Sequence, residues 1–311
     1  MLYYNAEEDI RDRYNIDLRQ YEADFAELQR LKRNAVSDLM RVERNKTWEP
    51  TVYERHYLPE LRLAGIKNKG SMVLQNTADL HLHTDYSDGD SLDHILAQAV
   101  HMKLDAIAVT DHNEIGGAFE ARRRAHQRKL PLAVVPGCEV SSRDGHIGAL
   151  FVMQTFPENL SAEETVRLIH EAGGIAVAHH PYSPKWLDRI SDVNMGCGDL
   201  IKTVPFDAVE CSNAVPGRGV KYNIAAIEAM RNHHIPIAVT GSSDAHYAKF
   251  VGKGKTYYAG NEGVVSLHES LLYGVTQGAE GYWKFREKIF YYSRLIKSIA
   301  KSGFKRIGSV G

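Results

Sequence analysis

The chain has 311 residues, of which 43% are hydrophobic and 25% are charged, as in an ordinary globular protein. Because 38 Lys and Arg residues face 39 Asp and Glu residues, the global charge does not point to nucleic acid or to a membrane surface. Three widely spaced cysteines suggest neither a disulfide framework nor a CxxC zinc site, whereas 15 histidines are an unusually high number. The first residues lack the pattern of a signal peptide, and no apolar run approaches the roughly 20 residues that span a bilayer, so we expect a cytoplasmic protein.

Residues 1–77 are highly charged, and apolar side chains recur within them at helical spacing. The pattern predicts an amphipathic helix, which we expect to pack against the main domain. A short coiled coil is the alternative, although the repeat is irregular. The apolar positions are Leu18, Tyr21, Phe25, Leu28, Ala35, Leu39 and Val42.

Short apolar runs alternate with amphipathic stretches over residues 78–279. Runs that are buried on both faces and separated by helices are typical of parallel βα units, so the predicted fold class is α/β. About seven such units predict a closed or nearly closed barrel with its chemistry at the carboxyl ends of the strands. The expected strands are 78–82, 106–110, 132–136, 146–152, 175–179, 206–211 and 235–240, and the expected helices are 91–103, 115–129, 161–172, 221–233 and 265–277.

The last segment, residues 280–311, is a basic tail in which apolar residues keep helical spacing. Such a helix can pack its apolar side on the barrel and leave its lysines in water, which is the interpretation we favour. A basic amphipathic helix can also lie on an anionic surface such as lipid or nucleic acid, and this alternative stays open.

Polar side chains gather where the predicted strands end. His81 and His83 are two residues apart, so on an extended strand both point the same way, toward the barrel mouth. The turn sequence SDGD is expected to bring Asp88 back over that strand end. A lone histidine is usually a satisfied polar residue, but many imidazoles and carboxylates together are costly to desolvate unless an ion binds them. The other strand-end residues are His112, Glu139, His146, His179, His180, Asp244 and His246.

The segments DLHLHTDYSDGD, AVTDHNE, PGCEVSSRDGH, AVAHHPY and GSSDAHY follow one another in this order between residues 78 and 256. In order and spacing they resemble the motifs of the PHP (polymerase and histidinol phosphatase) superfamily. Five ordered motifs are highly specific, whereas a single HxH motif is weak. The resemblance implies a distorted (β/α)7 barrel of the PHP type, and a centre of two or three divalent metal ions that hydrolyses phosphoesters.

The resemblance also assigns ligands to three metal sites. Strand alternation is expected to point His179 away, and His180 matches the family's histidine before proline, so His180 is the preferred ligand. Some relatives have His at the position of Asp88, which leaves occupancy of the third site open. The implied sets are His81, His83, Glu139 and Asp244 for the first ion, Glu139, His146 and His180 for the second, and Asp88, His112 and His246 for the third, with Glu139, Asp244 and His246 expected to be catalytic.

Imidazole and carboxylate ligands without thiolate favour manganese, iron or zinc ions. Two such ions lower the pKa of a water between them, so a metal-bridging hydroxide is the expected nucleophile. Arg218 and Arg143 are the candidate substrate contacts, with Lys253 as a third, although a solvated surface charge is the plainer interpretation of each.

We expect a phosphoesterase that acts on a nucleotide or another small phosphorylated metabolite, because the catalytic region is not basic. A nuclease that acts on RNA or DNA ends is the alternative, and it would favour a basic groove with interleaved aromatic residues. A metallohydrolase of a non-phosphate ester is also open. A non-catalytic regulatory domain is disfavoured, because every matched ligand position is filled.

Overall fold

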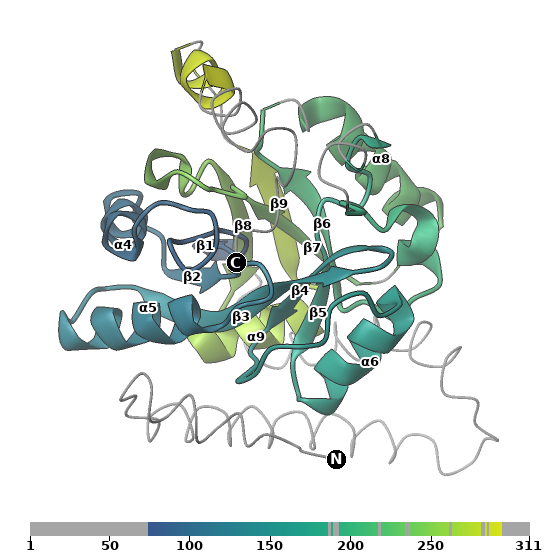
Figure 1. The fold of residues 1–311 in the computed structure, drawn as a ribbon, viewed down its shortest axis with the longest axis horizontal. Helices are drawn as coiled ribbons and strands as arrows, with labels where there is room; N and C mark the ends of the chain where they lie inside the picture. The colour runs from purple at the N-terminus through teal and green to yellow at the C-terminus, as the bar shows by residue number, and fades with distance from the viewer. Residues whose placement is uncertain are drawn as a thin grey trace.

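In the part of the chain that the structure describes, nine strands form one continuous central sheet, and helices surround it (Figure 1). The computed structural model describes residues 74–293, apart from 186–187, 189–192, 217–218, 234, 236, 261–262, 281–283 and 285. The strands are β1 Leu74–Asp79, β2 Ala106–Val109, β3 Ala133–Ser142, β4 Gly145–Leu150, β5 Ile175–Ala178, β6 Ala208–Asn213, β7 Ala238–Ser242, β8 Gly254–Ala259 and β9 Thr276–Glu280. The helices are α4 Leu92–His101, α5 Gly116–Gln127, α6 Ala162–Glu171, α8 Gly219–Asn232 and α9 Val264–Leu272, with short 3-10 turns at Gly198–Lys202 and Ala248–Phe250.

The order of the strands in the sheet is β7-β6-β5-β4-β3-β2-β1-β8-β9. Strands β1 to β3 run parallel, and so do β5 to β7, whereas β4 is antiparallel to both of its neighbours. The predicted α/β barrel is therefore confirmed, and β1 to β7 correspond to the seven expected strands. The expectation of parallel units throughout is wrong for β4, because the two-residue connection after β3 permits only a hairpin.

Two additional strands, β8 and β9, bring the sheet close to closure. Strand β8 pairs antiparallel with β1, and β9 pairs antiparallel with β8; sequence analysis did not include either strand. The hydroxyl of Thr256 on β8 accepts from the N–H of Gly241 on β7 at 3.0 Å and donates to its carbonyl at 2.8 Å. Thr276 on β9 makes the same pair of bonds with Val239, at 3.1 and 2.8 Å. Side-chain hydroxyls therefore join β7 to β8 and β9, between which no backbone ladder forms among the described residues.

The helices pack because their apolar residues recur on one side. In α6, the residues Ala162, Val166 and Ile169 are buried, and the hydroxyl of Ser161 caps the helix by accepting from the N–H of Glu164. Strand β2 is buried along its whole length, in agreement with an apolar run covered on both faces. The apolar cores therefore hold the ends of the parallel strands at one fixed edge.

The basic tail is described as far as a helix over residues 286–293. Its Phe290 and Tyr291 pack against the main core, where Phe290 meets Tyr247 and Phe250 at ring-centroid distances of 5.8 and 6.1 Å. Ile289 and Tyr292, which belong to the apolar side predicted to pack, are instead 53% and 41% exposed, so packing of that side on the barrel stays a prediction. The predicted helix within residues 1–77 lies outside the described residues, which begin with β1 at Leu74. Residues 294–311 also lie outside them. Among the described helices, none is long and apolar enough to cross a bilayer.

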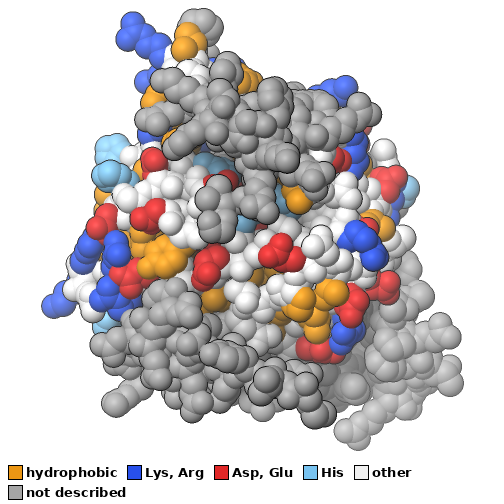
Figure 2. Space-filling view, in the orientation of Figure 1, with side chains coloured by type: hydrophobic (Ala, Val, Ile, Leu, Met, Phe, Trp, Pro, Cys, Tyr) orange, Lys and Arg blue, Asp and Glu red, His pale blue; other side chains and the backbone are white. Residues whose placement is uncertain are grey.

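Histidine side chains reach the surface near the middle of the face seen in Figure 2.

Candidate metal centre

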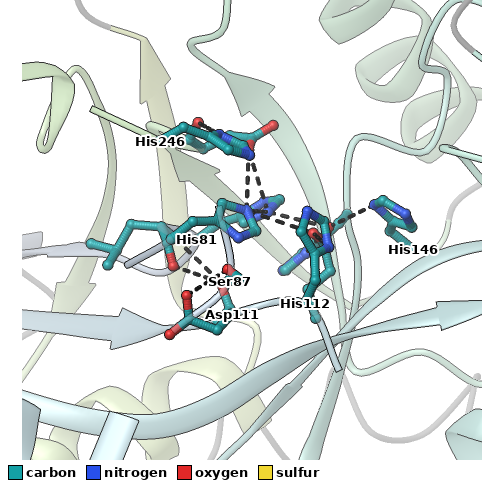
Figure 3. Close-up of polar contacts among 12 residues, drawn as sticks. His81, Ser87, Asp111, His112, His146 and His246 are labelled. Carbon is teal, nitrogen blue, oxygen red and sulfur yellow. Dashed lines mark hydrogen bonds and ion pairs between the residues drawn. The ribbon is translucent and has the colours of Figure 1, made fainter. Parts of the chain in front are cut away.

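Histidines and carboxylates from six strands converge at one end of the barrel (Figure 3). His81 and His83 follow β1, and His112 follows β2, so each leaves a parallel strand at its carboxyl end. Glu139 lies within β3, and His146 is the second residue of the reversed strand β4. The reversal places His146 at the same edge, because the start of an antiparallel strand lies beside the carboxyl ends of its neighbours. The remaining members follow β5 and β7, and they are His180, Asp244 and His246.

All nine predicted ligands belong to at least one compact group of potential metal donors. Within each group, the candidate donor atoms lie within 4.8 Å of one another. Glu139 belongs to two groups, as do His81, His83 and His112, so its bridging role stays a prediction. The groups are His83, Asp88, His112 and His246; His81, His180 and Asp244; His81, His83 and Glu139; and His112, Glu139 and His146.

The Glu139 carboxylate lies in the middle of this cluster and is almost completely buried. Its Oε1 is 3.2 Å from Nε2 of His81 and 3.2 Å from Nδ1 of His146, and its Oε2 is 3.1 Å from Nδ1 of His112. Burial alone would raise the pKa of Glu139, but the charges of His146 and His81 outweigh burial and hold the pKa well below its usual range. The carboxylate is therefore ionised and faces imidazoles on both sides.

Asp88 anchors the outer part of the cluster. Its Oδ2 is 3.2 Å from Nε2 of His246, and its Oδ1 is 3.8 Å from Nδ1 of His83. The turn therefore brings Asp88 back over the end of β1, as predicted. Burial alone would lower the pKa of His246, but the charge of Asp88 raises it to about 9. The outer residues keep contact with solvent, since the exposed fractions of Asp88 and His246 are 30% and 27%.

The donor set fits divalent metal ions. Within the described residues, Nδ1 of His83, His112 and His146 is buried and lies 3.1–3.8 Å from a carboxylate oxygen, but none of these contacts has the geometry of a hydrogen bond. A buried imidazole nitrogen without a hydrogen bond is unfavourable unless another electrophile takes its lone pair. The cluster contains imidazoles and carboxylates only, which suits manganese, zinc or iron, and nearby Cys138 is not part of any donor group. We conclude that this mouth can bind ions, while their identity and number stay predictions.

The backbone takes an unusual conformation at two of these residues. His180 and Asp244 have positive φ angles of 27° and 49°, which residues other than glycine rarely adopt. Such strain concentrates at functional sites, where the surrounding structure compensates for it. Asp244 is fixed by the bond from its N–H to the carbonyl of His81, so β7 is tied to β1 at the cluster.

The expectation that His179 points away from the cluster is wrong. Its Nδ1 donates to Oε1 of Glu139 at 2.9 Å, and its ring stacks on His81 at a centroid distance of 3.7 Å. Strand alternation does not apply here, because β5 ends at Ala178 and the left-handed His180 follows. His180 also lies in the cluster, with Nε2 at 3.3 Å from Oε1 of Glu139. The choice of His180 as ligand stays a prediction.

The candidate substrate contacts do not converge on the cluster. Arg143 is 66% exposed, and its nearest described acidic partner is Asp144 at 3.9 Å. Arg218 lies outside the described residues. Lys253 forms an ion pair of 3.0 Å with Glu287 of the helix over residues 286–293. Asp111 accepts hydrogen bonds from the loop residues Thr84 and Ser87, so it caps this loop.

Sequence analysis missed the buried carboxylate of Glu210 on β6. Its Oε1 accepts from Nδ1 of His81 at 3.2 Å, and its Oε2 accepts from Nδ2 of Asn213 at 3.0 Å. The signal that could have found it is the second of the two acidic residues in the run FDAVEC, near the carboxyl end of an expected strand. Burial raises the pKa of Glu210, but the charge of His81 and its hydrogen bond lower it further, so the net shift is downward.

Comparison with known proteins agrees with this geometry. Residues 79–297 match the PHP domain. An uncharacterized protein of Methanocaldococcus jannaschii is 36% identical over 160 residues, which are 48% of this chain and 88% of that protein. The 5'-3' exoribonuclease Rnm of Escherichia coli is 34% identical over 84 residues, which are 25% of this chain and 29% of that protein.

Among solved structures, a two-domain protein from Bacteroides vulgatus, described as containing a predicted PHP-like metal-dependent phosphoesterase, has a TM-score of 0.52. It is 20% identical, and the likeness covers 70% of this chain and 69% of the other. PsfC from Pseudomonas syringae has a TM-score of 0.51 at 18% identity, and the likeness covers 72% of this chain and 98% of the other. At these identities, both likenesses concern the fold.

Proposed function

The chain belongs to the PHP domain family, and from this premise we propose that it is a metal-dependent phosphoesterase. The observation that supports the proposal most strongly is the convergence of all nine predicted ligands into overlapping donor groups at one barrel mouth. His81, His83, Glu139 and Asp244 would hold the first ion, Glu139, His146 and His180 the second, and Asp88, His112 and His246 the third. When bound, such ions supply Lewis acidity and make hydroxide available near neutral pH.

The residues of the chain have separate tasks in this proposal. Glu139 presents one oxygen to each side of the cluster, so a single rigid strand orders both halves. Asp244 and His246 reach neighbouring donor groups from one short segment after β7. Preorganised ligands of this kind need no rearrangement when charge develops on a phosphoryl group. The carboxylates Asp88, Glu139 and Asp244 cancel half of the charge of three divalent ions, which leaves a positive centre for an anionic ester.

The exposure of the ligands indicates the side from which an ester would enter. The side chains of His81, His83 and Glu139 are at most 1% exposed, whereas those of Asp88 and His246 are about one quarter exposed or more. We therefore place the phosphate of the substrate on the Asp88 and His246 side. A small phosphorylated metabolite or nucleotide is our first choice, since the described residues next to the cluster contribute no run of cations.

A nuclease that acts on RNA or DNA ends is the second candidate. It is favoured by the similarity to the exoribonuclease of Escherichia coli, although the similarity covers only 29% of that protein. Recognition of an oligonucleotide would need contacts beyond the metal centre, such as cations along the backbone or aromatic residues for stacking. The substrate screen must therefore contain both classes.

The test combines metal analysis with a screen of substrates. Purified protein should contain two to three divalent ions, and it should hydrolyse a phosphomonoester or a 5'-phosphorylated oligonucleotide. Glu139→Gln should lower both metal content and turnover, the latter by more than about 100-fold. Glu228→Gln, an exposed position on α8, is the matched control and should change neither. Metal-free protein as purified, or full turnover in Glu139→Gln, would overturn the proposal.

A further inference from the structure

Glu210 is a buried carboxylate outside the predicted ligand set, yet it contacts three strands of the centre. Four donors point at its two oxygens. Oε1 accepts from Nδ1 of His81 and from the hydroxyl of Ser242, and Oε2 accepts from the N–H of His180 at 2.7 Å and from Nδ2 of Asn213 at 3.0 Å. The side chain is 1% exposed, so water cannot replace these bonds.

A carboxylate that accepts at both oxygens satisfies this arrangement. The N–H of His180 and the amide of Asn213 are donors in every state, and both lie at the same oxygen. The other oxygen must accept from Ser242 and from His81. An isosteric amide at position 210 would have to turn an NH2 group toward one of these pairs. A glutamine would keep its oxygen toward His180 and Asn213 and would turn its NH2 toward Nδ1 of His81, which favours the opposite tautomer of that ring.

The contact with His81 fixes which ring nitrogen faces the cluster. Because Nδ1 donates to Glu210, Nε2 carries the free lone pair in the neutral ring. That Nε2 lies 3.2 Å from Oε1 of Glu139 and 3.6 Å from Oδ1 of Asp244. The tautomer that can bind an ion is therefore the one that Glu210 selects.

The same carboxylate also holds a second candidate ligand. Nδ2 of Asn213 lies 3.0 Å from Oε2 of Glu210 and 3.0 Å from Oδ2 of Asp244, so one amide connects the two acids. The bond from the N–H of His180 fixes the main chain at the left-handed residue. His81, His180 and Asp244 together form one of the donor groups, and Glu210 touches all three directly or through Asn213.

We infer that Glu210 is the positioning residue of the donor group His81, His180 and Asp244. It selects the metal-binding tautomer of His81 and aligns the other two members. The inference rests on the proposed function only in that the centre binds divalent ions. Partners of this kind typically change metal affinity by about 10–100-fold.

The experiment compares wild-type protein with Glu210→Gln by titration of the full chain with Zn²⁺, followed by calorimetry and elemental analysis. We expect one ion to bind about 10–100-fold more weakly in the variant, or to be lost, while the ion next to Asp88 and His246 binds as before. Asp207→Asn is the matched control. Asp207 precedes the same strand at its opposite end, where it accepts from the N–H of Ala176, so its loss should change stability without changing Zn²⁺ binding.

A second readout concerns the tautomer itself. In nitrogen-15 spectra of the Zn²⁺-loaded wild type, Nδ1 of His81 should be protonated and Nε2 should be metal-bound, and Glu210→Gln should change this pattern. If Glu210→Gln does not fold, Ser242→Ala removes one donor at the same oxygen and should weaken the same ion several-fold. Unchanged Zn²⁺ affinity together with an unchanged His81 spectrum would overturn the inference. Normal Zn²⁺ binding by a wild type that hydrolyses no phosphoester would instead contradict the proposed function.

Discussion

Replacement of Gly148 by Ala tests whether His179 is held rigidly against the centre. Gly148 pairs with Glu139 in the β3–β4 ladder, and a Cβ atom at position 148 would lie 2.2 Å from Nε2 of His179. Because ordinary contacts begin near 3.4 Å, the ring would have to move by about 1 Å. It has no free direction, since it stacks on His81 and donates to Glu139. Overpacking of this kind costs about 1–3 kcal/mol, which lowers Tm by roughly 2–12 °C in a domain of this size.

The assay is thermal unfolding of the metal-free protein, followed by Zn²⁺ titration, because a displaced His179 should also displace His81. His179→Ala removes the ring that would clash, so it provides a double-mutant cycle. In the His179→Ala background, Gly148→Ala should cost much less than in the wild type. An equal loss of Tm in both backgrounds would refute the clash as the cause.

Three further predictions concern the stability and packing of the barrel. Glu120→Gln should cost about 1 kcal/mol at pH 7, because hydrogen bonds from Arg123 and Arg124 hold the pKa of Glu120 below 4.5 despite its burial. A lowered pKa stabilises the fold above the unfolded value, so the difference in unfolding free energy should shrink as the pH falls below about 4, and a constant difference would contradict this cause. Thr256→Val should lower the free energy of unfolding by about 2 kcal/mol or more in chemical denaturation, because the N–H and the carbonyl of Gly241 on β7 lose their partner. A loss under about 0.5 kcal/mol would show that the contact between β7 and β8 contributes little to stability. All three cysteines are free and buried, and burial raises the pKa of Cys197 to about 12, so a thiol reagent at pH 8 should label them only after unfolding, and rapid labelling of the native protein would contradict the packing.

The sequence predicts the convergence at the barrel mouth for a simple physical reason. Parallel strands of one sheet end at the same edge, so residues such as His81, His112 and His180 must meet once the βα units are recognised. The position of Asp88 could also be predicted, because its turn sequence directs the chain back over the same strand end. Local spacing and one global rule were sufficient for these residues.

Other features depend on contacts that local patterns do not encode. The orientation of His179 follows from the end of β5 and the positive φ of His180. The side-chain alternation of a regular strand therefore predicted wrongly that His179 points away from the cluster. The role of Glu210 depends on donors that are 30 or more residues away, such as His81 and Ser242. Strands β8 and β9 were missed because neither GKTYYA nor TQGAE is an apolar run, and the expected helix 265–277 overlaps the start of β9.

The packing of the imidazoles has a consequence for every mutational study of this barrel. The rings of His81 and His179 lie against each other, and His83 stacks on His246 at a centroid distance of 4.2 Å, so these side chains are structural filling as well as donors. An alanine in place of one of them leaves a void in addition to an open coordination position. Inactivity of an alanine variant can therefore result from lost packing or from a lost metal ligand, and only a parallel measurement of its folding separates the two causes. Asparagine or glutamine fills more of the space of the histidine ring than alanine does, so these substitutions test the loss of the metal ligand with less loss of packing.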